Sequence, residues 1–398
     1  MAWSKALFAA AMAERTSPRS VVFSSVPANQ IGSSEVEAMI RIRGKGVAAT
    51  LILAGSGFAF LLLAQSAIAQ DRLQAGNPRT AVLKPASSPY IDAHVHIDQH
   101  DPEGAVQLLL RAMDGLNGAK AFIQTEPYGP DNPGRWDAEM ILPAVKKHPD
   151  KLMVLCGGGT LNPMILESWR TGDSGPEVKR KFRERAEELL REGVSGFGEL
   201  STEHLSLPQS PVKDYEYAPA DQPLMLLLAD IAAEHNVPIG LHMECVPIDM
   251  PMPAEYKAPN PPELHANIAP LERLLSHNQR AKIIWAHAGA DNLGYRTPEL
   301  SRRLLLAHPN LYMEIKYDPN FPGKDPPIVN GKLKPEWLKL FSDFPDRFII
   351  GSDQHYDPPA TVPLARGQQN AFLTDQLPPD LKRKIGMENS LRIYGLHR

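Results

Sequence analysis

Short apolar runs alternate with amphipathic segments from residue 90 onward. Eight runs have the length and composition of buried strands, at residues 90–96, 120–125, 152–158, 194–200, 237–244, 282–289, 311–315 and 347–353. Six segments between them have helical periodicity, at residues 102–116, 177–192, 222–235, 270–276, 297–308 and 335–343. This alternation predicts an α/β protein with a closed parallel (β/α)8 TIM barrel as a single domain over residues 90–398.

The segments after the predicted strands are longer than those after the predicted helices. The long ones cover residues 126–135, 201–220, 245–268 and 356–364, and many of the 38 prolines lie in them. In a barrel of this kind the loops that follow strands build the active-site rim, whereas the others only reverse the chain. We therefore expect functional side chains at the ends of strands.

The first 69 residues precede the barrel and contain the features of an export signal. Arg41, Arg43 and Lys45 come before an apolar stretch at residues 47–64, and residues 67–69 have the small-x-small pattern of a cleavage site. We interpret residues 39–69 as a signal peptide, 1–38 as an upstream extension that is not used, and 70–89 as a linker. The alternative for 39–69 is an uncleaved membrane anchor, because the stretch approaches the length of a spanning helix.

Composition narrows the class of protein. The chain is 43% hydrophobic and 22% charged with a net charge of -4, which is typical of a globular protein and gives no indication of a nucleic-acid partner. Cys156 and Cys245 are the two cysteines. Their predicted strands have another strand between them, so the separation is roughly 9–10 Å, beyond the ~7 Å that a disulfide tolerates. We expect free buried thiols even in an oxidising compartment.

Side chains able to bind metal recur where five of the predicted strands end. They are His94, His96, Glu199, His242, His287 and Asp353. A single histidine in a strand is more often a core residue, but one parallel barrel brings all five strand ends to the same rim. Nitrogen and oxygen ligands of this kind suit Zn²⁺ and its first-row neighbours. We expect one or two divalent ions, with zinc foremost.

This pattern resembles the amidohydrolase superfamily of metal-dependent barrels. The sequences Tyr-Ile-Asp-Ala-His-Val-His and Ile-Ile-Gly-Ser-Asp are most similar to its amidohydrolase-related branch, which includes aminocarboxymuconate-semialdehyde decarboxylase and lactone hydrolases. The resemblance implies that His94, His96 and His242 are metal ligands and that Asp353 is a ligand and proton acceptor. It implies that His287 either binds a second metal or polarises the substrate.

Glu199 departs from the single-metal members of that branch. A glutamate after the fourth strand looks more like members in which a carboxylate or carbamylated lysine bridges two metals, among them TatD-type deoxyribonucleases. The alternative is that Glu199 hydrogen-bonds a ligand histidine. The number of ions therefore stays open.

Four further residues on or near the rim are candidates for substrate binding. They are Arg135, Arg296, Lys316 and His355. A cation at the rim could hold a substrate carboxylate. For each of them a solvated side chain is the alternative interpretation.

The sequence thus predicts an exported, periplasmic or secreted, metal-dependent hydrolase of a small amide, lactone or ester. An activated hydroxide would attack, with Asp353 as general base and acid. The alternatives are a non-oxidative metal-dependent decarboxylase of a small carboxylated substrate and a non-catalytic periplasmic binding protein on a degenerate barrel. We expect a membrane partner only if the leader is uncleaved. The sequence identifies neither the substrate nor whether the chain forms a homo-oligomer.

Overall fold

The computed structural model describes residues 37–44, 47–54, 84–131, 137–207, 215–256, 259–318, 323–358 and 365–396. Two compact units divide the chain, Met1–Pro78 and Arg79–Arg398. In the first unit, β1 (Glu37–Gly44) pairs antiparallel with β2 (Val47–Ala54). The rest of the predicted leader lies outside the described residues, so export and cleavage stay predictions. Among the described residues, none of the helices combines the length and hydrophobicity that spanning a membrane requires.

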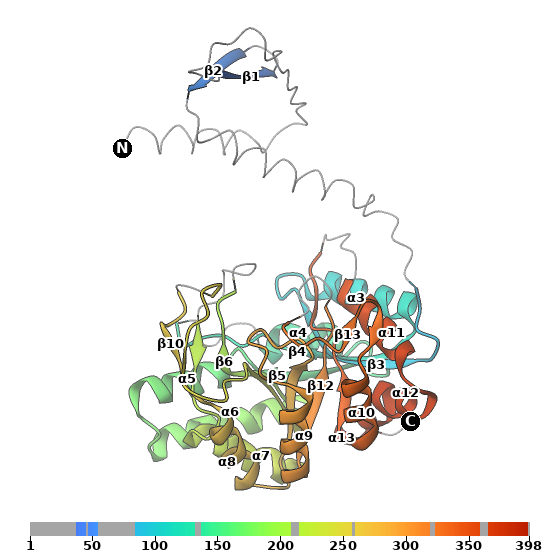
Figure 1. Ribbon diagram of the computed structural model, residues 1–398. Coiled ribbons are helices and arrows are strands. Elements are labelled where there is room, and N and C mark those ends of the chain that lie inside the picture. The colour runs from blue at the N-terminus through green and yellow to red at the C-terminus, as the bar shows by residue number, and fades with distance from the viewer. Residues whose placement is uncertain are drawn as a thin grey trace. The chain divides into compact units, whose positions relative to one another are not determined.

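The second unit is the predicted parallel barrel (Figure 1). Its strands in chain order are β3 (Tyr90–Ile97), β4 (Gly118–Gln124), β5 (Leu152–Gly157), β6 (Phe197–His204), β8 (Pro238–Met243), β11 (Lys282–Ala288), β12 (Leu311–Ile315) and a last strand in two pieces, β15 (Phe348–Ile350) and β16 (Gln354–Tyr356). Successive strands pair in parallel along the whole series. β15 pairs with β12 and β16 pairs with β3, so the eighth strand closes the sheet and the fold prediction is confirmed.

The three residues between β15 and β16 carry the chain across the closure. The amide of Gly351 donates to the carbonyl of Ile315 on β12 (3.0 Å), and the amide of Asp353 donates to the carbonyl of His94 on β3 (2.8 Å). The interruption between β15 and β16 therefore places Asp353 beside the first strand, β3.

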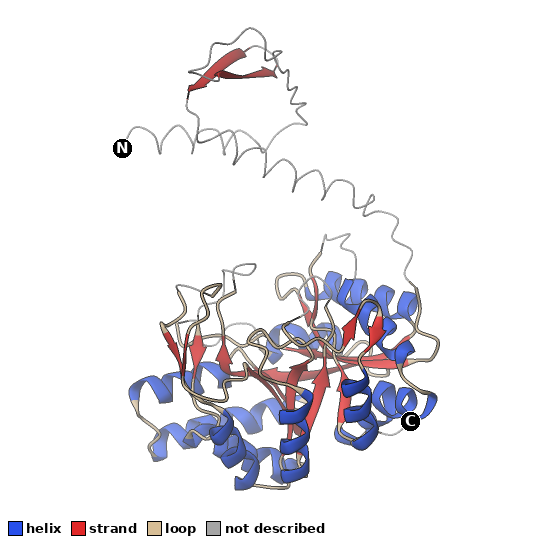
Figure 2. Ribbon diagram, viewed as in Figure 1, coloured by secondary structure: helices blue, strands red, loops and turns tan. Residues whose placement is uncertain are grey.

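Helices cover the outside of the barrel (Figure 2). They are α3 (Pro102–Leu116), α4 (Ala138–Val145), α5 (Leu161–Thr171), α6 (Pro176–Glu192), α7 (Pro223–His235), α8 (Ile268–His277), α9 (Pro298–Ala307), α10 (Pro335–Asp343), α11 (Ala365–Gln376), α12 (Pro379–Arg383), a π-helix at Lys384–Glu388 and α13 (Asn389–Ile393). The six helices predicted from periodicity are all present. Sequence analysis missed α4, in which Pro143 lies inside the helix, and α5, in which Pro163 lies in the first turn.

Short strand pairs shape the rim. β7 (Glu216–Tyr217) pairs antiparallel with the end of β6, β9 (Met250–Pro251) with β10 (Glu263–Leu264), and β13 (Ile328–Val329) with β14 (Lys332–Leu333). The fourth strand was predicted to end at Leu200, but β6 continues to His204. Thr202 and Glu203 in this extension are polar and yet buried, and Glu203 accepts hydrogen bonds from Tyr215 (2.6 Å) and Asn267 (3.3 Å).

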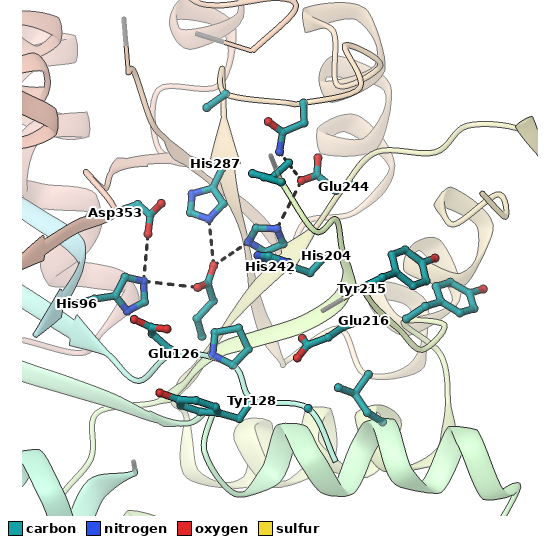
Figure 3. A pocket seen from close by; sticks show the side chains of 18 of the residues that line it. His96, Glu126, Tyr128, His204, Tyr215, Glu216, His242, Glu244, His287 and Asp353 are labelled. Atoms are coloured by element: carbon teal, nitrogen blue, oxygen red, sulfur yellow. Dashed lines mark hydrogen bonds and ion pairs between the residues drawn. The ribbon is translucent and has the colours of Figure 1, made fainter. Parts of the chain in front are cut away.

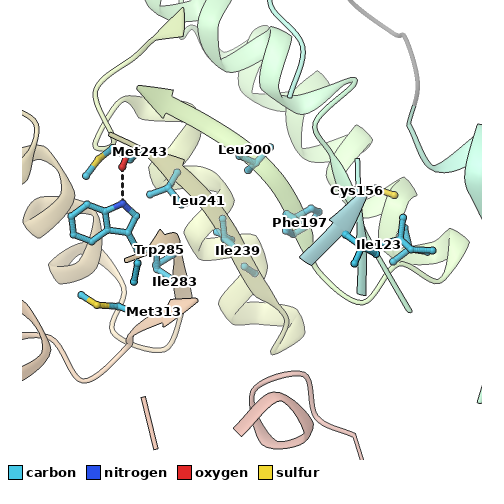
Figure 4. Close-up of a cluster of buried hydrophobic side chains, with 14 of the residues drawn as sticks. Ile123, Cys156, Phe197, Leu200, Ile239, Leu241, Met243, Ile283, Trp285 and Met313 are labelled. Atoms are coloured by element: carbon cyan, nitrogen blue, oxygen red, sulfur yellow. Dashed lines mark hydrogen bonds between the residues drawn. The ribbon is translucent and has the colours of Figure 1, made fainter. Parts of the chain in front are cut away.

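Alternate residues of each strand pack on its two sides. One cluster contains outward residues such as Ile283, Trp285 and Cys156, which pack against the helices (Figure 4). A second cluster contains Phe122 of β4, which points to the other side of its strand from Ile123, and Tyr394 near the C-terminus. The ring centroids of Phe122 and Tyr394 are 4.0 Å apart. Both cysteines are buried and free, as expected.

Replacing Phe122 with alanine is expected to destabilise the barrel by about 3–5 kcal/mol, because the change removes a fully buried ring and leaves a cavity. Chemical denaturation followed by circular dichroism measures the change. Leu306→Ala on the exposed face of α9 is the control, because this side chain is 72% exposed, and it should change the free energy of unfolding by less than about 0.5 kcal/mol. Equal effects of the two changes would contradict the packing described here.

Candidate metal centre

The six expected ligand residues come together at the carboxyl ends of the barrel strands. Figure 3 labels four of them, His96, His242, His287 and Asp353. His94 and His96 lie on β3, Glu199 on β6, His242 on β8, His287 on β11 and Asp353 between β15 and β16. Because His94 and His96 are two residues apart on one strand, both rings point to the same side, as their spacing predicted.

One group of ligand atoms forms around His94 and His96. Their Nε2 atoms are 3.1 Å apart, and Asp353 Oδ1 lies 3.0 Å from His96 Nε2 and 3.9 Å from His94 Nε2. Glu199 Oε2 lies 3.7 and 3.6 Å from the Nε2 atoms of His94 and His96. Two histidines and two carboxylates therefore face one position.

A second group shares Glu199 with the first. Glu199 Oε1 lies 3.0 Å from His242 Nδ1 and 3.0 Å from His287 Nε2. The two oxygens of one carboxylate thus face two separate pairs of histidines, the arrangement that a bridging ligand requires.

The hydrogen-bond partners of the Nδ1 atoms of His94 and His96 indicate which nitrogen of each ring carries the proton. His96 Nδ1 lies 2.9 Å from the carbonyl of Gln124, which can only accept, so this Nδ1 is protonated. His94 Nδ1 lies 2.9 Å from Glu314 Oε2. In the neutral rings both Nε2 atoms therefore carry lone pairs that face each other, and the contact is favourable when a shared metal ion, or a proton on His94, lies between them. The residues present fit a divalent metal ion.

The electrostatics of the carboxylates agree with this fit. Burial raises the pKa of Glu199, but His94 and the hydrogen bonds from His242 and His287 outweigh it and hold the pKa well below its usual range. The pKa of Asp353 is likewise held well below its usual range, because Lys316 and Arg366 overcome the effect of burial. Both ligands are therefore ionised at neutral pH.

The histidines divide into two kinds. Burial, with Lys316 nearby, lowers the pKa of His287 to about 3, and burial lowers the pKa of His96. Burial also acts on His242, but Glu199 and Glu244 raise its pKa to about 9, and Glu314 and Glu199 raise the pKa of His94 well above its usual value. In the metal-free chain, protons on His94 and His242 supply positive charge that the carboxylates demand.

Two of the expected ligands adopt left-handed backbone conformations. The φ angles of His287 and Asp353 are 66° and 52°, a region that non-glycine residues rarely occupy. Such conformations cost of order 1–3 kcal/mol and persist where the surroundings impose them. For Asp353 the surroundings include the hydrogen bond to the His94 carbonyl.

Lys316 and His355 line a cavity of about 990 Å³ above the ligand cluster. Lys316 Nζ lies 2.5 Å from Asp353 Oδ2, and Arg366 Nη1 lies 3.1 Å from the same oxygen. The ring of His355 lies over that of His96, with centroids 4.6 Å apart, and its Nδ1 is 3.3 Å from Glu126 Oε1. These side chains border the place that a substrate would occupy.

The two other candidates have different surroundings. Arg296 also lines the cavity but is only 3% exposed, donates to the carbonyl of Ala286 and lies over the ring of Trp285, 4.3 Å from its centroid. These contacts give Arg296 a packing role in the rim. Arg135 lies outside the described residues.

Sequence analysis did not single out Glu314. It lies near the end of β12, is 1% exposed and contacts His94. The available signal was one carboxylate in the otherwise apolar run Leu-Tyr-Met-Glu-Ile. Because burying a charge without a partner is costly, a glutamate in such a strand indicates a polar site inside the fold.

Comparisons with known proteins identify the family of the chain. The family model described as Amidohydrolase matches residues 91–396. No curated protein matches the chain. The solved structures that resemble it include an amidohydrolase 2 from Bifidobacterium longum subsp. infantis, with 12% identity over 78% of this chain and 100% of that chain and a TM-score of 0.40.

Two further solved structures show similar levels of likeness. ATU3138 from Agrobacterium tumefaciens is 13% identical over 79% of this chain and 99% of that chain, with a TM-score of 0.44. The spore coat polysaccharide biosynthesis protein spsE from Bacillus subtilis is 9% identical over 77% of this chain and 76% of that chain, with a TM-score of 0.36. Because the family model matches residues 91–396, most of the length of the chain, the chain belongs to the amidohydrolase family.

Proposed function

We propose that the protein is a metal-dependent hydrolase with two divalent ions, acting on a small amide, lactone or ester. The observation that carries the proposal is the position of Glu199, whose Oε2 faces His94 and His96 while its Oε1 faces His242 and His287. Asp353 completes the first position. Imidazole nitrogens and carboxylate oxygens favour zinc or a first-row neighbour.

A divalent ion in such a site lowers the pKa of water from 15.7 towards ≈ 7 and polarises a substrate carbonyl. Asp353 supplies the proton transfer. Its Oδ1 faces the ligand cluster and can accept the proton of the attacking water, then return it to the leaving group. Its Oδ2 is held by Lys316 and Arg366, which fix the orientation of the carboxylate.

The cavity supports a small-molecule substrate. Its volume of about 990 Å³ lies at the upper end of the range for ligand pockets, roughly 300–1,000 Å³. Tyr128, Trp169 and Tyr217 line one part of it, and Lys316 and Arg366 line another. Aromatic side chains can cover the apolar part of a substrate, while the cations lie near the reacting end.

The bridging position of Glu199 favours hydrolysis over the decarboxylase alternative. Glu199 departs from the single-metal members of the amidohydrolase-related branch and looks more like members in which a carboxylate bridges two metals, because it faces two pairs of histidines. Carbon dioxide release from aryl carboxylates without turnover of lactones, dipeptides or aryl esters would overturn the hydrolase proposal. Binding of small molecules without any turnover would favour the non-catalytic alternative.

Glu199→Ala is expected to reduce the metal content from two ions per chain to one or none, because it removes the carboxylate that offers one oxygen to each position. Elemental analysis after dialysis against zinc measures the content. Glu203→Ala is the control, since Glu203 is buried on the same strand but contacts Tyr215 and Asn267. Two ions retained in Glu199→Ala would show that Glu199 is not a bridging ligand.

Asp353→Asn is expected to lower kcat by about 10²–10⁴-fold, because the amide cannot take up a proton. At least one ion should stay bound, since His94, His96 and the second group remain. Hydrolysis of a panel of lactones, dipeptides and aryl esters gives the rates. Asp249→Asn, an exposed carboxylate at the rim, should leave kcat unchanged. Full activity in Asp353→Asn would remove this residue from the mechanism.

We also propose that residues 39–69 direct export and are removed, so that the mature protein begins at Gln70. Intact-mass measurement of protein recovered from the periplasm or medium tests this expectation. Leucine at positions 67 and 69 should block processing, because the cleavage site needs small residues there. A mature species that retains residues before Met39 would contradict the proposal for the upstream extension.

A further inference from the structure

We propose that Glu314 is a positioning residue shared by the two metal positions, with one oxygen holding a histidine of the first and the other oxygen a histidine of the second. The inference rests on the proposed two-ion site and extends it to a side chain that contacts no ion. It assigns the buried carboxylate of β12 the task of keeping both rings turned towards Glu199.

The distances connect Glu314 to both groups. Glu314 Oε2 lies 2.9 Å from His94 Nδ1, and Glu314 Oε1 lies 3.7 Å from His287 Nδ1. The second separation is longer than a hydrogen bond, yet Glu314 Oε1 and His287 Nδ1 are both buried and have no other hydrogen-bond partner among the described residues. The rings of His94 and His287 are stacked with centroids 5.1 Å apart, so one carboxylate beneath them can serve both.

The backbone leaves room for this carboxylate. A Cβ atom on Gly351 would lie 2.6 Å from Oε1 and 2.7 Å from Cγ of Glu314. No side chain fits there unless Glu314 moves. The lack of a side chain at Gly351 therefore gives the Glu314 carboxylate the space it occupies between the first and second ligand groups.

Only a carboxylate offers an acceptor to both rings. An amide in its place would offer its oxygen to His94 Nδ1 and its NH₂ group to His287 Nδ1. The second contact would make His287 Nδ1 an acceptor and move the ring proton to Nε2, the nitrogen that faces Glu199. A protonated Nε2 cannot bind a metal ion, so the amide would disable the second position alone.

Metal content distinguishes this role from a general packing role. Glu314→Gln is expected to bind one ion per chain under conditions where the wild-type chain binds two, and Glu314→Ala to bind both ions about 10–100-fold more weakly. Zinc titration with elemental analysis gives stoichiometry and affinity, and the visible spectrum of the cobalt-loaded protein reports the geometry of the remaining site. Glu203→Gln, a buried acid without contact to a ligand histidine, should keep two ions and the wild-type spectrum.

Gly351→Ala tests the same contact from the other side. It should weaken metal binding as Glu314→Ala does, because its new methyl group displaces the carboxylate. Nitrogen-15 spectra of histidine-labelled, zinc-loaded wild-type protein need no variant, and they should show His94 and His287 with the proton on Nδ1, because in the loaded site Nε2 faces the ion.

The outcomes separate the two proposals. A wild-type chain that binds no zinc or cobalt overturns the proposed function. A wild-type chain that binds two ions, with Glu314→Gln also binding two at unchanged affinity, overturns the role of Glu314 alone. A His287 proton on Nε2 in the zinc-loaded wild-type protein overturns it as well, even if the variants fail to fold.

Discussion

The burial of one negative charge determines the rest of the site. Glu199 is 4% exposed, and a carboxylate removed from water is costly unless charges and donors compensate it. Here compensation comes from four imidazole rings on three different strands. No one of those strands could satisfy the carboxylate by itself, so the arrangement exists only when the barrel is closed. The need to compensate the buried charge of Glu199 thereby connects closure of the barrel to assembly of the ligand cluster.

Closure also brings the two ends of the domain together. Asp353 is more than 250 positions from His94 along the chain, yet its amide bonds to the His94 carbonyl, and the amide of Ser352 bonds to Asp92 Oδ1 (2.8 Å). These bonds lie in the gap between β15 and β16, where the regular ladder changes from β12 to β3. The irregular backbone at Asp353 thus serves two purposes, because it closes the sheet and places the Asp353 side chain in the ligand cluster.

The sequence predicted the barrel and the side chains that meet at its rim because both depend on local signals. Apolar runs mark the strands, and His94, His96 and His287 come where those runs end. Glu314 escaped prediction because its partners come from β3 and β11, and nothing near it in sequence indicates either. Lys316 was expected to bind substrate, but a loop position does not reveal that its ammonium group lies 2.5 Å from Asp353 Oδ2. Contacts between side chains on strands distant in sequence cannot be predicted from local patterns, because only the folded barrel brings those strands together.

Protons and metal ions compete for the same nitrogen lone pairs at this site. Glu199, Glu244 and Glu314 raise the pKa values of His242 and His94, so without metal these rings hold protons that neutralise the buried carboxylates. An ion that binds must displace those protons, and it replaces their charge while the carboxylates stay compensated. Protons attracted by these carboxylates therefore compensate the buried negative charge when no divalent ion is bound. The same carboxylates and imidazoles can therefore be compensated either by protons or by a divalent ion.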